Sequence, residues 1–238
     1  DGIQVLTARE REGTTDGLFL AAKGGHNAES HNHNDVGHFI VGLDGAPVLI
    51  DVGVETYTRK TFSAERYEIW TMQSAYHNLP TIDGQQQLAG AEFRANDVAA
   101  EVSNDAAGLS LDIASAYPSE AGIRSWRRSI RLDRGPEAAV TLRDTWDLAW
   151  APAQLTLALM AASDVEVVEP GVLRCMGVGR SLDVRFDPAT FDAEIERIDI
   201  DDTRLSPVWG DHVSRVLLHV TAPAALGNWI LTMAAGGN

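Results

Sequence analysis

The stretch "SWRRSIRLDRGPEAAVTLRDTWDL", residues 125–148, contains the clearest fold signal in this sequence. The central "RGPE" is a turn signal, and it separates two segments in which apolar and polar residues alternate. Alternation at period two places one set of side chains on a buried face and the other on an exposed face. The expected buried set of the first segment is Trp126, Ile130 and Leu132, opposite Arg127, Ser129 and Arg131. The expected buried set of the second is Val140, Leu142, Trp146 and Leu148. The stretch therefore predicts an antiparallel β-hairpin.

The same alternation continues on both sides of this hairpin. Upstream, "VGHFIVGL" and "APVLIDVG" flank Asp44-Gly45, a dipeptide typical of a tight hairpin turn. Downstream, "AQLTLALMA", "SRVLLHVTA" and "GNWILTMAA" repeat the pattern. About twelve such segments at short spacing predict an all-β fold, an antiparallel sandwich or barrel. Only residues 63–76 suggest a helical turn or two, and no linker or repeat interrupts the chain, so we expect one domain over residues 1–238.

Composition narrows the classes of partner. The 238 residues carry 34 acidic and 19 basic side chains, a formal net charge of −15. A nucleic-acid-binding protein usually has a basic footprint, so no nucleic acid is expected. No run of about 18 apolar residues occurs, so no membrane is expected. Acidic substrates remain open, because a local arginine cluster can oppose the global charge. The start "DGIQVLTARE" has neither Met nor a signal-peptide pattern, and we interpret the chain as a piece of a longer protein.

Polar chemistry concentrates in "AESHNHNDVGHFIVG", residues 28–42, which holds three of the seven histidines. His31 and His33 are two apart, so on an extended chain both side chains would project to one face. Asp51 ends the segment "PVLID", and His77 lies in "SAYHNLPTIDG". Two imidazoles and one carboxylate suit zinc, with a water or a fourth group completing the coordination.

The residues alone leave three interpretations of this cluster open. The histidines and asparagines can form a hydrogen-bonded loop without metal. The cupin barrel also uses H-x-H, although Gly37 and His38 stand where its glutamate is expected. The third interpretation is a zinc site, whose imidazoles are oriented by hydrogen bonds from Asn32, Asn34 and Asp35.

A longer pattern carries a family resemblance. "KGGHNAESHNHNDVGHFIVGLDGAPVLIDVGVETYTRKTF", followed by "ERYEIWTMQSAYHNLPTIDG", resembles the C-terminal β-sandwich domain of the heparinase II/III-like polysaccharide lyases. In that family H-x-H-N-D opens a strand, an aspartate ends the next strand, and a His-Asn pair follows before a short strand with a Gly-containing turn. The close match covers about residues 17 to 84. Beyond it, the resemblance rests on strands rich in tryptophan.

The resemblance implies a β-sandwich of roughly twelve strands and a set of functional residues. It implies a structural zinc on His33, Asp51 and His77, and it implies that His31 faces a sugar-binding cleft and takes part in catalysis. Family members cleave uronate-containing acidic polysaccharides by β-elimination. A base removes the proton at C5, an acid protonates the leaving oxygen, and the developing carboxylate charge needs a neutralising partner.

One departure from the family is large. Its enzymes carry most catalytic residues, including an essential tyrosine, on an N-terminal helical toroid, and this chain shows no such helical region. We therefore expect a missing N-terminal helical domain as a partner, and an isolated chain that is inactive. The rival hypothesis is a zinc-stabilised carbohydrate-binding or interaction module without catalysis.

Basic and aromatic residues near the histidines are the candidates for binding the glycan. Arginine favours bidentate binding of a carboxylate, so a uronate is expected to contact Tyr57, Arg59, Arg66 and Tyr67, with Lys60 nearby. His38 is expected to be a packed or surface residue, and His212 and His219 to be structural. The overall acidity favours alginate-like or unsulfated uronates over heavily sulfated heparin. The resemblance also leads us to expect a periplasmic or secreted location.

Overall fold

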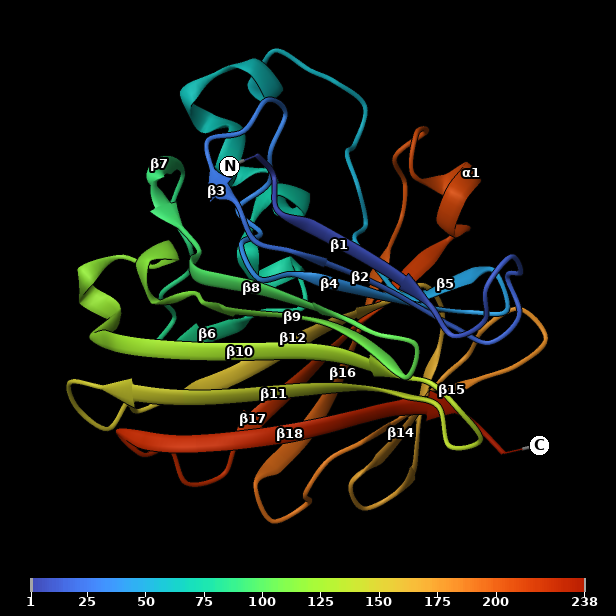
Figure 1. Ribbon diagram of the computed structural model, residues 1–238. Helices are drawn as coiled ribbons and strands as arrows, with labels where there is room; N and C mark the ends of the chain where they lie inside the picture. The colour runs from blue at the N-terminus through green and yellow to red at the C-terminus, as the bar shows by residue number, and fades with distance from the viewer. Residues whose placement is uncertain (1, 238) are drawn as a thin grey trace.

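Two antiparallel sheets of eight strands form the body of the computed structural model, which describes residues 2–237 (Figure 1). The first sheet runs in the order β1 (Val5–Arg9), β2 (Leu18–Lys23), β4 (Phe39–Leu43), β5 (Ala46–Leu49), β12 (Leu155–Ala161), β17 (His212–Val220) and β16 (Phe191–Asp199), with β6 (Pro80–Ile82) also paired to β12. The second runs in the order β13 (Val165–Glu169), β14 (Val172–Cys175), β15 (Leu182–Arg185), β18 (Leu226–Ala235), β11 (Ala139–Leu148), β10 (Ile123–Asp133), β9 (Ala106–Asp112) and β8 (Asn96–Val102). A separate two-stranded sheet pairs β3 (His26–Asn27) with β7 (Gly90–Arg94). The predicted all-β antiparallel sandwich is confirmed.

The hairpin predicted over residues 125–148 is the β10–β11 pair of the second sheet. Its register sets Trp126 opposite Trp146, and the predicted inward-facing residues of both strands are buried. The rings of Trp126 and Trp146 stack with centroids 5.2 Å apart, and Trp229 of β18 lies 4.7 Å from Trp146. Each aromatic pair contributes about 0.5–1.5 kcal/mol beyond the burial of its area. The tryptophans therefore lie in the core between the sheets.

The turn at Asp44–Gly45 joins β4 to β5 as predicted. Both residues adopt the left-handed backbone conformation, with φ of +51° and +83°. A type I′ turn needs positive φ at both central positions, and this conformation matches the right-handed twist of the flanking strands. Aspartate tolerates this conformation and glycine adopts it without steric cost, so the dipeptide fixes the register of the pair.

The structure contains eighteen strands among its described residues, where alternation predicts about twelve. The additional strands are short: β3 has two residues, β6 has three, and β14 and β15 have four each. Segments this short show no period of their own. Their extended conformation depends on pairing with a longer neighbour such as β12 or β18.

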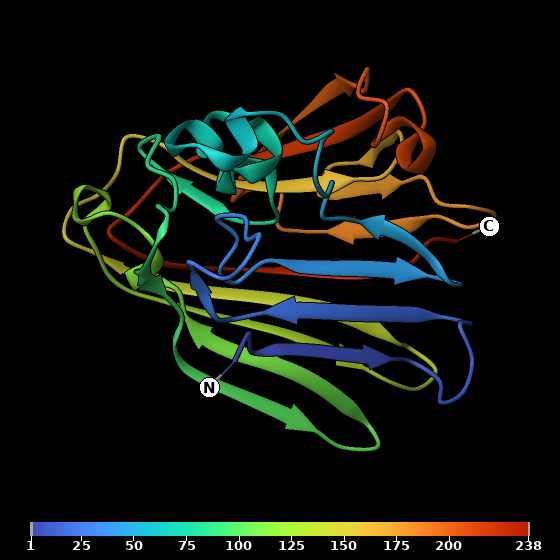
Figure 2. The same ribbon diagram turned by 90° about the horizontal axis from the view of Figure 1, so that it is seen from above.

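A layer of short helical turns covers part of the outer face of the first sheet (Figure 2). The structure has four 3-10 turns here: η1 (Lys60–Phe62), η2 (Ala64–Glu68), η3 (Trp70–Met72) and η4 (Ser74–Tyr76). The last three lie within residues 63–76, where the sequence predicts a helical turn or two. Trp70 and Tyr76 pack there against a second apolar cluster that includes Ile50 and Met160. This layer carries His77 to the end of the sheet where β5 finishes. The other short helices are η5 (Ala114–Ala116), η6 (Ser119–Ala121) and α1 (Ser206–Trp209).

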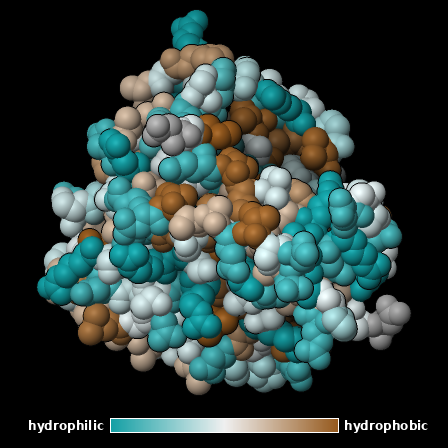
Figure 3. All heavy atoms as spheres, in the orientation of Figure 1, coloured by the Kyte–Doolittle hydropathy of each residue, from teal (hydrophilic) through white to brown (hydrophobic). Residues whose placement is uncertain are grey.

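The surface mixes polar and apolar side chains. Hydrophilic residues cover much of the face in Figure 3, and hydrophobic ones gather in its upper part. Exposed apolar side chains include Phe62 and Val208. Within residues 2–237, no helix has the length and apolarity needed to cross a membrane.

Candidate metal centre

Three side chains from separate segments converge at one end of the first sheet. His33 lies in the loop before β4, Asp51 lies two residues after β5, and His77 follows η4. His33 Nδ1 is 3.1 Å from His77 Nε2 and 3.6 Å from Asp51 Oδ1, and His77 Nε2 is 3.8 Å from Asp51 Oδ2. In the part of the chain that the structure describes, no other group of three or more His, Cys, Asp or Glu side chains brings its ligand atoms together in this way.

These donors suit a zinc ion in type and in spacing. Zinc bonds of about 2.0–2.2 Å in a tetrahedron separate the ligand atoms by roughly 3.3–3.6 Å. The observed separations of 3.1, 3.6 and 3.8 Å bracket that range. Three protein ligands leave a fourth position for water. His77 also has the outer hydrogen bond that metal-bound imidazoles usually make, because its Nδ1 donates to the carbonyl of Gln73 at 2.8 Å and so leaves a free electron pair on Nε2.

The protonation states of these residues also suit metal binding. Burial lowers the pKa of His33 below its ordinary value, which keeps the ring neutral at neutral pH. Burial by itself would raise the pKa of Asp51. The imidazoles of His77 and His33 outweigh burial, and with the Gly53 N–H, which donates to Oδ1 at 2.7 Å, they hold the pKa of Asp51 well below its usual range. Neutral imidazole and ionised carboxylate are the forms that coordinate zinc.

His38 lies against this cluster but is excluded from it by its tautomer. The backbone N–H of Asn78 donates to His38 Nδ1 at 2.9 Å, so the proton of the neutral ring is on Nε2. Burial lowers the pKa of His38 well below its ordinary value. Its ring meets His77 edge to face, with centroids 5.0 Å apart. His38 is therefore a packed residue, in agreement with one of the two predicted environments, and not a ligand.

The loop from Ser30 to Asn34 places His31 and His33 in different environments. His31 has φ of +60° and is exposed, whereas His33 is buried. The one shared face expected of an extended chain does not occur, because the backbone turns here, with Asn32 N donating to the Glu29 carbonyl. His31 is thus a neighbour of the cluster that faces solvent.

The predicted glycan-binding residues divide into two groups. Arg66 Nη2 donates to the Asn32 carbonyl at 3.0 Å, and Tyr67 Oη donates to Asn32 Oδ1 at 3.2 Å, so both contact the residue between His31 and His33. The other two lie on the segment before η1, which has a different set of neighbours. Tyr57 packs on Phe62 and under the guanidinium of Arg204, Arg59 is exposed, and Lys60 pairs with Glu68 at 2.8 Å.

A buried ion pair behind the cluster was not identified from the sequence. Arg128 of β10 and Asp144 of β11 are cross-strand partners with no exposed side-chain surface, joined by bonds of 2.8 and 2.7 Å. Arg128 Nη1 also donates to the carbonyls of Gly37 and Asn78, which precede His38 and follow His77. The alternation predicts this burial, because Arg128 lies two residues from Trp126 and Asp144 two residues from Trp146, on the same buried face of each strand.

The comparisons with known proteins agree with this fold. A family model described as heparinase II/III-like, C-terminal, matches residues 2–171. No curated protein matches the sequence.

Solved structures similar to this chain include a heparan sulfate lyase, HepC, from Pedobacter heparinus, with a TM-score of 0.77 and 16% identity over 99% of this chain and 36% of that one. Another is described as the heparinase III BT4657 gene product with methylated lysines, with a TM-score of 0.74 and 14% identity over 99% of this chain and 35% of that one. A third is described as heparinase III, with a TM-score of 0.70 and 15% identity over 99% and 36%. This chain therefore spans about a third of the length of these structures.

Proposed function

Because the chain belongs to the heparinase II/III-like C-terminal family, we propose that it is the β-sandwich domain of a lyase that cleaves uronate-containing acidic polysaccharides by β-elimination. The observation that carries the proposal is the pairing of two features in one loop. His33 and His77 are buried beside the half-buried Asp51, and two residues before His33, His31 is exposed. A buried donor set and an exposed proton-transfer group suit a rigid loop at the edge of a substrate cleft.

His31 is the residue that we assign to proton transfer. β-Elimination needs one group to remove the C5 proton and one to protonate the leaving glycosidic oxygen. An exposed imidazole can either accept or donate a proton, so it can take either role. It cannot fill both positions at once, and therefore the second proton-transfer group belongs to another part of the enzyme.

Arg66 and Tyr67 hold the histidine loop in place. Arg66 uses Nη1 and Nη2 on the carbonyls of Thr61 and Asn32, so the guanidinium ties the loop to the η1–η2 segment. Tyr67 donates its hydroxyl proton to the Asn32 side chain. A zinc ion on His33, Asp51 and His77 would supply a further cross-link between three segments, and it acts as a structural ion in this proposal.

The proposed substrate is a uronate-containing acidic glycan. The similar structures are named as heparinases or as a heparan sulfate lyase, which favours a uronate-containing glycan of that type. The alginate expected from overall acidity has no support among these names. The rival proposal, a zinc-stabilised carbohydrate-binding module, shares the fold and the metal but not the chemistry. A periplasmic or secreted location is proposed with either.

The test is an assay for the ultraviolet absorbance of new unsaturated uronate ends, with heparosan, hyaluronan, heparin and alginate as substrates. A longer parent that includes a helical domain is expected to turn over at least one of them. His31→Ala in that parent is expected to lower turnover by about 10²–10⁴-fold, the usual contribution of one acid–base group. His212→Ala, which changes a distant histidine, is the matched control.

The outcomes separate the two functions. Glycan binding without turnover by the parent would favour the carbohydrate-binding module. Robust turnover by the 238-residue chain alone would contradict the division of chemistry between two domains, and would require Tyr57 or Tyr67 to act as the second group.

A further inference from the structure

A groove of about 740 Å³ lies beside the histidine loop. Its walls come from the segment before β1, from the two-stranded sheet of β3 and β7, and from the start of β8. Figure 1 shows β3, β7 and the N-terminal segment together at this end of the molecule. Ser30, the residue before His31, also lines the groove. A chain-like ligand at His31 would therefore have this groove as a neighbouring site.

Two nitrogen donors stand side by side in the groove. His26 and Arg94 are cross-strand partners in the β3–β7 pair, and both line the groove. Directly opposed residues of an antiparallel pair have their Cβ atoms about 4.5–5.5 Å apart on one face. The Ala28 N–H donates to His26 Nδ1 at 3.1 Å, so the neutral His26 ring carries its proton on Nε2 and offers a donor there.

Arg94 forms no salt bridge with a carboxylate among the described residues, unlike most arginines of this protein. Among residues 2–237, no salt bridge or side-chain hydrogen bond engages it, and it is exposed. Each of the two acids that line the groove lies near a cation: Glu29 is 3.3 Å from Lys23 Nζ, which it shares with Asp35, and Asp97 is 3.2 Å from Arg127. In a chain of net charge −15, an arginine left unpaired beside a histidine donor marks a local site for an anion.

We propose that His26 and Arg94 form a subsite for an anionic group of the glycan, a carboxylate or a sulfate on a sugar adjoining the one at His31. This subsite rests on the proposed function, which identifies its ligand as an acidic glycan. A guanidinium fork and an imidazole N–H suit either anion, because both present two or more acceptor oxygens. The groove would fix the register of the glycan relative to His31.

The experiment measures the affinity of the 238-residue chain for two oligosaccharides by titration calorimetry. Heparosan fragments carry carboxylates only, and heparin fragments carry carboxylates and sulfates. Arg94→Gln is expected to weaken binding by about tenfold, the loss of one partly exposed charge-assisted hydrogen bond. His26→Gln, which keeps an N–H donor, is expected to weaken it less. Arg143→Gln removes the same charge from the exposed face of β11 and is the control, with wild-type affinity expected.

Loss in Arg94→Gln for both oligosaccharides identifies the group as a carboxylate, and loss for heparin alone identifies it as a sulfate. Equal affinity in Arg94→Gln and wild type, equal loss in Arg94→Gln and Arg143→Gln, or no binding of either oligosaccharide by the wild-type chain would overturn the subsite. The turnover assay of the parent tests the lyase proposal separately. If the parent cleaves glycan and Arg94→Gln leaves its KM unchanged, the lyase proposal stands and the subsite is rejected. If glycan binding depends on Arg94 but the parent shows no turnover, the subsite stands and the lyase proposal is rejected.

Discussion

The ring nitrogen that keeps its proton decides what each histidine of this protein can do. His77 donates from Nδ1 to a carbonyl and so has a free electron pair on Nε2. His38 and His26 accept backbone N–H groups at Nδ1 and are donors at Nε2. Backbone partners therefore set all three tautomers, and of these three rings only that of His77 presents a free electron pair at Nε2 to the candidate metal.

Metal removal tests the assignment of His33 and His77. If zinc is bound at about a thousand times its dissociation constant, it adds about 4 kcal/mol to the free energy of unfolding. A chelator is therefore expected to lower the melting temperature of the wild-type chain by several degrees and to leave that of His33→Ala unchanged. An equal response of both proteins to chelator would contradict the assignment.

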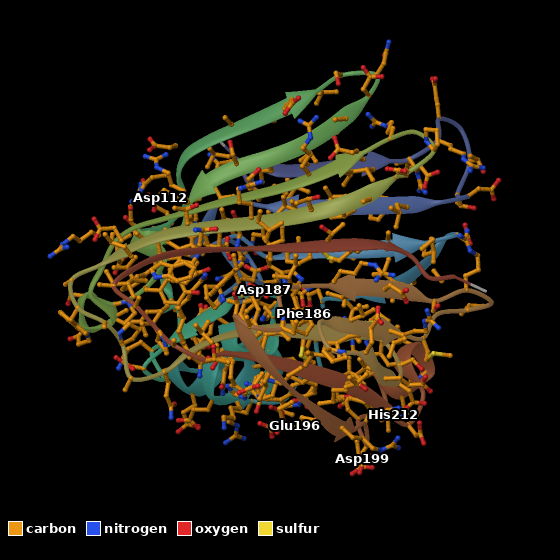
Figure 4. All side chains as sticks on the ribbon, turned by 90° about the horizontal axis from the view of Figure 1, so that it is seen from below. Asp112, Phe186, Asp187, Glu196, Asp199 and His212 are labelled. Atoms are coloured by element: carbon orange, nitrogen blue, oxygen red, sulfur yellow. The ribbon has the colours of Figure 1, made fainter. Side chains whose placement is uncertain are left out.

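His212 provides a pH-dependent contribution to stability. Its Nδ1 is 2.7 Å from Asp211 and its Nε2 is 2.9 Å from Asp164, and it lies opposite Asp199 in the β16–β17 pair (Figure 4). The hydrogen bond to Asp211, aided by the one to Asp164, raises the pKa of His212 above its ordinary value. A raised folded-state pKa stabilises the protein below the unfolded pKa of about 6.5, and the stabilisation disappears as pH rises through the folded pKa.

The variant His212→Gln is therefore expected to be less stable than wild type at about pH 5.5 and equally stable at about pH 8.5. The difference at low pH is expected to be below about 1 kcal/mol, because the acids are exposed and solvent screens the pairs. Urea unfolding at the two pH values measures it. A difference of the same size at both values would mean that packing, not charge, explains the effect.

Among the elements, the Arg128–Asp144 pair connects the second sheet to the loops of the candidate metal centre. Asp144 Oδ2 also accepts the indole N–H of Trp229 at 2.9 Å, so β10, β11 and β18 share one buried carboxylate. Arg128 extends that network to the carbonyls of Gly37 and Asn78. Asn78 uses its side chain as well, donating to the Phe39 carbonyl and accepting from Met160 N. The position of His77 is thereby tied to both sheets.

Breaking this pair on one side is expected to be costly. Arg128→Met leaves a buried carboxylate without its cation and is expected to destabilise the fold by about 3–5 kcal/mol. The double variant Arg128→Met/Asp144→Leu removes both charges and is expected to recover part of that loss. Arg127→Met, on the exposed face of the same strand, is the control, with a change within about 0.5 kcal/mol. Equal losses in the single and double variants, measured by urea unfolding, would argue against an unpaired charge as the cause.

Local patterns explain which elements are predictable from the sequence. The β10–β11 hairpin and the Asp44–Gly45 turn follow from alternation and turn chemistry within about 25 residues, and both are confirmed. The burial of Arg128 and Asp144 was not predicted, because only apolar residues were assigned to the buried face of each strand. The separation of Tyr57 from Arg66 was not predictable, because proximity in sequence does not fix the path of an irregular segment. His33, Asp51 and His77 were grouped through family resemblance, since their spacing alone leaves a metal-free loop equally open.

At the scale of the whole molecule, the two sheets bury one continuous core without a further domain. That core includes Trp126, Trp146 and Trp229 from the second sheet, and Leu20 and Leu157 from the first. The chain is therefore expected to unfold in one cooperative transition, because both inner faces are covered. Coincident loss of the near-ultraviolet tryptophan signal and the far-ultraviolet strand signal would show this, and separate midpoints would contradict it.

We propose a zinc centre on His33, Asp51 and His77 with His31 outside it. The most direct measurement is the zinc content of the 238-residue chain, purified without chelator, in wild type, His31→Ala and His33→Ala. The expected result is about one equivalent of zinc in wild type and in His31→Ala, and far less in His33→Ala. Wild-type protein with well under one equivalent, or equal loss in both variants, would contradict the claim.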